Sequence, residues 1–181
     1  MLPLAWGATP DEHARPYPAD TLVDRPLLLT RAVDVAAPVP LTWRWLCQVA
    51  VAPYSYDWID NGGRGSPREL TRGADELVLG QAMAKVFTLT SYDVAHQWTA
   101  LTDARGRRLF GPCAMTFAAE PSGADSRIVC RLAVAAGSPL ERVRAQALAW
   151  GDLVMMRKQL HTLKELAERD ARRQAGSSPA S

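Results

Sequence analysis

Residues 138–173, which decide the fold of this chain, read SPLERVRAQALAWGDLVMMRKQLHTLKELAERDARR. Ser138, Pro139 and Glu141 form a helix-start signature, because an N-cap serine is followed by proline at the first helical position and by an acidic residue three places after the cap. Apolar residues then recur every three or four positions, which predicts one long helix with an apolar stripe over about six turns. The stripe consists of Ala145, Ala149, Leu153, Met156, Leu160, Leu163 and Ala167.

In the front half of this helix a second apolar row lies beside the first and consists of Val143, Ala147, Trp150 and Val154. Its continuation through Arg157, His161 and Lys164 is polar. We therefore expect a sheet to wrap the front half, while the rear half lies on the surface and ends near residues 172–173. Residues 174–181 are small and polar, which predicts a disordered tail.

Upstream of the helix, alternating apolar residues predict a run of antiparallel strands at 28–36, 82–90, 94–102, 108–119 and 126–136. Turn residues separate the later strands, among them 103–107. Residues 38–50 have helical spacing, and Ser66 opens a second helix-start signature with Pro67 and Glu69. This order is α+β and predicts a curved antiparallel sheet wrapped around the terminal helix, with two short helices after the first strand and an apolar cavity beneath the long one.

Residues 1–26 contain five prolines and no sustained periodicity. They are expected to form a proline-rich extended arm, neither a helix nor a central strand, that lies over the domain or frays. Because 181 residues is the length of one domain, residues 27–173 should fold as a single unit.

The composition narrows the class of protein. With 21 basic and 19 acidic residues the net charge is +2, which does not favour a nucleic-acid partner. Three widely spaced cysteines predict a cytoplasmic protein with buried thiols, and the absence of a long apolar run predicts no membrane span. His13, His96 and His161 form no ligand pair, so no metal is expected.

Tryptophan is the commonest aromatic residue, with six copies against four tyrosines and three phenylalanines. Most of these indoles are expected to pack a helix against the sheet. Trp43 and Trp45 are two positions apart on a helix, so only one of them is expected to face the core.

Residues Arg31-Ala-Val-Asp-Val-Ala-Ala-Pro38, followed by Trp43-Arg-Trp-Leu46, resemble the opening of the START-like, pollen-allergen-like helix-grip superfamily of polyketide cyclases, dehydrases and lipid carriers (SRPBCC). The element Tyr54-Ser-Tyr-Asp-Trp58 is similar to that of a bacterial subgroup. The resemblance covers roughly 28–170 and implies a helix-grip domain over 27–173 with a hydrophobic cavity and no obligatory cofactor. Members of the superfamily include cyclases, lipid-binding carriers, hormone receptors and chaperone activators, so the fold does not fix the function.

The candidate ligand-binding residues are aromatic or apolar side chains expected to line the cavity: Tyr54, Tyr56, Trp58, Trp98, Met115, Phe117, Trp150 and Val154. Asp57 and His96 are the candidate catalytic pair, since a buried carboxyl and an imidazole can exchange protons with a bound carbonyl compound. The alternative is structural, with Asp57 capping local backbone and His96 at the rim of the sheet.

Three functions follow from these residues. The first is non-catalytic binding of a hydrophobic or aromatic small molecule between the sheet and the long helix. The second is a cyclase, aromatase or dehydratase activity that uses Asp57 and His96. The third is a chaperone-activator-like role, in which the apolar and basic helix end binds a protein partner. The sequence leaves the ligand, the oligomeric state and the pathway open.

Overall fold

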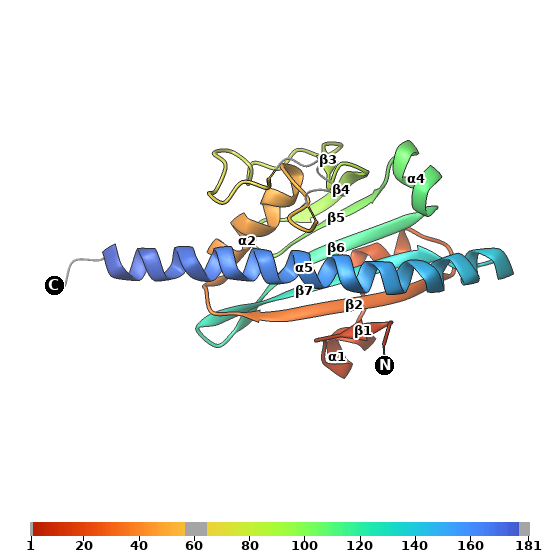
Figure 1. Cartoon of the computed structure of the whole chain (residues 1–181), viewed down its shortest axis with the longest axis horizontal. Coiled ribbons are helices and arrows are strands. Elements are labelled where there is room, and N and C mark those ends of the chain that lie inside the picture. The colour runs from red at the N-terminus through yellow and green to blue at the C-terminus, as the bar shows by residue number, and fades with distance from the viewer. Residues whose placement is uncertain (1, 57–64, 178–181) are drawn as a thin grey trace.

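The chain forms a single open sheet crossed by one long helix, as Figure 1 shows. The computed structural model describes residues 2–56 and 65–177. Within these residues the sheet has seven strands in the order β1-β2-β7-β6-β5-β4-β3, and every neighbouring pair is antiparallel except β1 with β2. The strands are β1 (Ala5–Trp6), β2 (Pro26–Val35), β3 (Ala82–Met83), β4 (Phe87–Asp93), β5 (Gln97–Thr102), β6 (Cys113–Ser122) and β7 (Asp125–Ala135).

Strand register places alternate residues of the central strands on one buried inner face. Leu29 pairs with Leu132, and Val33 pairs with Ile128 four residues further along. Because side chains alternate across a strand, these residues point to the same side and meet the long helix α5 (Pro139–Ser177). The curved sheet and terminal helix predicted from the sequence are confirmed.

Two short helices follow β2, namely α2 (Val39–Cys47) and the 3-10 helix η2 (Gln48–Ala50). Trp43 and Trp45 are both buried, so the expectation that only one faces inward was wrong. The reason is that α2 lies between the sheet and α5, which cover two of its faces. The indole of Trp45 donates a hydrogen bond to Asp170 Oδ2 of α5 at 3.2 Å.

The burial of α5 is the reverse of the expected one. In its rear half, residues such as Leu160, Leu163 and Leu166 are fully buried against α2 and the sheet. In its front half only Ala145 and Ala149 are fully buried, and the second apolar row is exposed. Periodicity identifies apolar faces, but it does not say which faces have a neighbour. The helix also continues through Ser177, so residues 174–177 are helical, and 178–181 lie outside the described residues.

Residues 2–25 are ordered: strand β1 extends the sheet at the edge of β2, and helix α1 (Pro10–Ala14) and 3-10 helix η1 (Pro18–Thr21) also form in this segment. The expectation of an arm without helix was therefore wrong. Thr9 and Glu12 form a reciprocal capping box that starts α1, with Glu12 Oε2 accepting from the Thr9 amide at 2.7 Å. Arg131, fully buried on β7, donates to the carbonyls of His13 and Arg15 at 2.8 and 2.9 Å and holds this arm down.

Two local predictions between strands were also wrong. Residues 103–107 do not form a turn, because Asp103 caps helix α4 (Ala104–Phe110) by accepting from the Gly106 amide at 2.7 Å. Ser66 does not start a helix, and its hydroxyl accepts from the Tyr54 amide at 3.2 Å.

Candidate functional site

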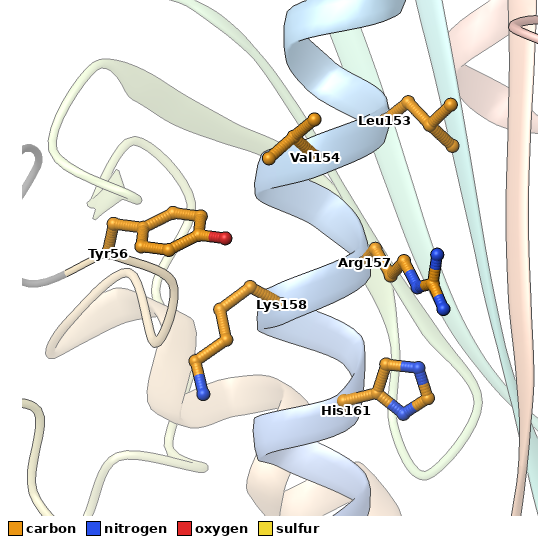
Figure 2. Close-up of a pocket in the computed structure, with 6 residues that line it drawn as sticks. All are labelled: Tyr56, Leu153, Val154, Arg157, Lys158 and His161. Atoms are coloured by element: carbon orange, nitrogen blue, oxygen red, sulfur yellow. The ribbon is translucent and has the colours of Figure 1, made fainter.

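A groove lies on α5 where the helix passes the segment that carries Tyr56. It has a volume of about 420 Å³ and is lined by Tyr56, Leu153, Val154, Arg157, Lys158 and His161. Figure 2 shows the Tyr56 ring pointing across the groove toward the helix, with Val154 and Lys158 on the same side as Tyr56 and Arg157 and His161 on the other. Five of the six lining residues therefore come from three consecutive turns of one helix.

The Tyr56 wall is fixed to the core through its neighbours. Gln159 of α5 donates a side-chain hydrogen bond to the carbonyl of Pro53. The Tyr54 ring is fully buried edge-to-face against Trp45, with 6.1 Å between ring centroids, and its hydroxyl donates to Gln48 Oε1 at 3.3 Å. These contacts tie residues 53–54 to α5 and α2 immediately before Tyr56, so this wall is positioned by the packed core.

The opposite wall is supported by Trp6 of β1. The rings of Trp6 and His161 meet edge-to-face with 5.6 Å between centroids, and the Arg157 guanidinium lies 5.5 Å from the Trp6 centroid. Such a cation–π contact contributes ~0.5–1 kcal/mol at an exposed site. The N-terminal arm thereby fixes two of the groove residues from outside the helix.

An ion pair anchors α5 beside the groove. Asp152 Oδ2 lies 2.9 Å from Arg31 Nη2, and the Arg31 side chain is 1% exposed. Arg31 also donates to the Ala149 carbonyl at 3.3 Å. Burial raises the pKa of Asp152 to about 6, and the nearby Arg31 charge limits this rise. The pair holds the α5 segment that carries Leu153 and Val154 against β2.

The structure separates the eight predicted ligand-binding residues. Tyr56 and Val154 line the groove, and Trp150, which is 55% exposed, lies one turn before Val154 on the same helix face. Tyr54 supports the groove wall from within the core. Trp58 lies outside the described residues.

The remaining three residues lie on the inner face of the sheet. Trp98 and Phe117 are fully buried and stacked, with 4.8 Å between their centroids, and the Trp98 indole donates to the Leu46 carbonyl at 3.1 Å. Met115, from the same face, belongs to the same buried cluster. These side chains occupy the space beneath the helices where the sequence predicted a cavity.

His96 was predicted to lie on a strand, but it lies in the turn between β4 and β5. Its ring is 47% exposed, and Nδ1 lies 3.3 Å from Asp93 Oδ2. It is not among the residues that line the groove. Asp57 lies outside the described residues, so the proposed catalytic pair stays a prediction.

The cysteines behave as buried small apolar residues, as predicted. All three are buried and free. Burial raises the pKa of Cys113 to about 12 and raises those of Cys47 and Cys130 as well. Thiols this weakly acidic carry little thiolate at neutral pH and are poor nucleophiles.

Leu153, Arg157, Lys158 and His161 are groove residues that sequence reasoning did not assign to the site. The available signal was the second row of the long helix, which changes from apolar at Val154 to basic at Arg157 and His161. The support from Trp6 was not visible, because Trp6 is about 150 positions away in the sequence and its strand was not predicted.

The architecture defines the chain as a helix-grip fold. Among solved structures it is similar to the Zhui aromatase/cyclase from Streptomyces sp. R1128, with a TM-score of 0.52 and 16% identity over 85% of this chain and 99% of that one. It is also similar to protein MLL2253 from Mesorhizobium loti, with a TM-score of 0.52 and 10% identity over 78% and 97% of the two chains. No family model and no curated protein matches the sequence. At these identities the likeness establishes the fold alone.

The described residues form no helix that combines the length and apolarity needed to cross a bilayer. They also contain no group of three or more histidine, cysteine or acidic side chains arranged to hold a metal ion.

Proposed function

We propose that this protein binds a hydrophobic or aromatic small molecule without transforming it, and that the molecule lies in the α5 groove. The observation that carries the proposal is the continuity of the groove with an exposed apolar row. Val154, a groove residue, is 56% exposed, and Trp150 presents an exposed indole one turn away. Neither side chain is required to fill the core.

The size and composition of the groove support this proposal. Its volume of about 420 Å³ falls in the range typical of small-molecule sites, ~300–1,000 Å³. Tyr56, Leu153 and Val154 supply apolar area, and a tyrosine ring adds a flat surface for stacking at low entropic cost. A lipid-like chain or a flat aromatic body would lie along α5 between Tyr56 and Trp150.

The enzymatic alternative has less support. The exposed His96 is paired with Asp93 and is absent from the groove lining. The three thiols are buried and weakly acidic. The fold of the Zhui aromatase/cyclase is compatible with an enzyme, but the acid–base role predicted for His96 requires it within hydrogen-bond reach of the substrate.

A partner-binding role would use a longer surface. Leu140 and Val143 are 80% and 71% exposed and continue the row that contains Trp150 and Val154. A protein partner would cover all four residues, whereas a small molecule needs only the end next to Tyr56. The free, buried cysteines agree with the proposed cytoplasmic location, where thiols stay reduced.

The experiment is a fluorescence titration with N-phenylnaphthylamine, a neutral apolar dye that brightens when it leaves water. We expect saturable binding at one site. Trp150→Ala and Val154→Ser should each weaken it by about fivefold or more, because each removes apolar contact area worth ~1 kcal/mol or more.

Val94→Ser is the matched control. Val94 is 69% exposed in the β4–β5 turn and lies outside the groove, so its substitution should leave the affinity unchanged. The proposal is overturned if the dye does not bind, or if Val94→Ser weakens binding as much as Val154→Ser.

A further inference from the structure

The groove contains an excess of positive charge that no carboxylate in its lining offsets. Arg157 and Lys158 are two of its six lining residues, His161 adds an imidazole, and the other three are uncharged. No ion pair of Arg157 or Lys158 with another described residue is present.

Further along the same helix three basic side chains are paired with carboxylates. Lys164 pairs with Glu168, and Arg169 and Arg173 each reach Glu69 at 3.3 and 3.1 Å. Arg157 and Lys158 differ from these three side chains in having no carboxylate partner among the described residues. Both side chains are exposed, so their attraction for a counter-charge is strongest at low ionic strength.

Two of these side chains are held in place before any ligand arrives. Arg157 and His161 are one helical turn apart on one face of α5, and both rest on the Trp6 ring. Figure 2 shows both side chains on the side of α5 that faces away from Tyr56. Fixing donors in advance lowers the entropic cost of binding, so this pair is a better anion site than two free surface side chains.

We infer that the ligand of the groove is an amphipathic anion, with an apolar or aromatic body along Tyr56, Val154 and Trp150 and an oxyanion group at Arg157 and His161. This inference rests on the proposed function and adds the chemical class of the ligand. The guanidinium offers paired N–H donors to a carboxylate or sulfonate, and the imidazole offers one more. Lys158, on the Tyr56 side of the groove, adds a second positive charge.

The test compares two dyes that share one aromatic body. Anilinonaphthalenesulfonate carries a sulfonate, and N-phenylnaphthylamine is the same body without it. We expect the sulfonate dye to bind roughly tenfold more tightly at low salt, the effect of one charge-assisted contact. Raising the salt from about 0.01 M to about 1 M shortens the Debye length from ~30 to ~3 Å and should reduce this preference.

Variants locate the charge effect. Arg157→Gln and His161→Gln should lower the affinity for the sulfonate dye more than that for the neutral dye, so the ratio of the two falls. Arg142→Gln is the control, because Arg142 is an exposed arginine on α5 that does not line the groove. It should leave the ratio unchanged. Circular dichroism of each variant checks that the fold is intact.

The outcomes separate the inference from the function on which it rests. If the neutral dye binds and the sulfonate dye binds no more tightly, the anion site is refuted and the apolar groove stands. If Arg142→Gln lowers the ratio as much as Arg157→Gln, the attraction is general surface charge and the inference fails. If neither dye binds, the proposed function fails as well.

Discussion

Replacing Asp152 by asparagine should change how the stability of the protein depends on pH. Asp152 faces the buried Arg31 at 2.9 Å, and burial raises its pKa from the ordinary 3.8 to about 6. Between these two pH values the folded protein keeps a proton that the unfolded chain has lost. The stabilising effect of that proton is fully present below about pH 4 and is lost as the pH rises through about 6.

The magnitude follows from the size of the shift. A difference of about 2 between the folded and unfolded pKa, at 1.36 kcal/mol for each pH unit, gives ~3 kcal/mol as an upper value. The Asp152→Asn variant has no titrating group at this position. Its stability relative to the wild type should therefore rise by up to that amount between about pH 4 and about pH 7.

Urea denaturation of both proteins between about pH 4 and about pH 7 measures the difference in their free energies of unfolding. The contributions of titrating groups that both proteins share cancel in this difference. Asp125→Asn, which removes an exposed carboxylate, controls for the change in net charge. If wild-type stability instead rises with pH relative to Asp152→Asn, attraction to Arg31 outweighs burial and the reasoning is wrong. A stability difference between the two proteins that does not change with pH would also refute the reasoning.

Three further predictions concern the N-terminal arm and the thiols. Gly7→Ala should destabilise the protein by ~1–3 kcal/mol more than Gly123→Ala, as measured by thermal melts. Both glycines have positive φ, but a new Cβ at Gly7 would lie 2.1 Å from the Ala32 carbonyl oxygen, whereas a new Cβ at Gly123 would meet open space. Arg131→Met should release the arm, seen as faster hydrogen exchange in residues 8–20 with little change in β6, and equal exchange in both proteins would contradict the assigned role of Arg131. Cys113 and the other two thiols should resist alkylation near pH 8 until the protein unfolds; rapid labelling of the native protein would show that they are not buried as described.

The sequence was sufficient to predict the fold because its strongest signals are periodic. The capping box at Ser138 and the stripe through Leu160 located the long helix, and alternation located β2 and β7 within about two residues. The arm was misjudged because five prolines dominated the interpretation. Thr9 and Glu12 carried a capping box that the sequence already displayed.

The site was only partly predictable. Tyr56 and Val154 were chosen for their chemistry, and both line the groove. Trp98 and Phe117 were chosen by the same rule, but they lie in the packed core, since an aromatic residue on an inner strand face looks the same in sequence whether it meets a ligand or a neighbour. The contact of Trp6 with His161 joins the two ends of the chain and has no local sequence signal.

The central claim is that a ligand lies in the α5 groove and not between the sheet and the helices. The most direct measurement is a methyl NMR titration with N-phenylnaphthylamine. We predict shifts at the methyl groups of Leu153 and Val154, in the groove, and none at those of Leu89 and Ile128, in the buried core beneath it. Shifts confined to Leu89 and Ile128 would place the ligand inside the sheet and contradict the account.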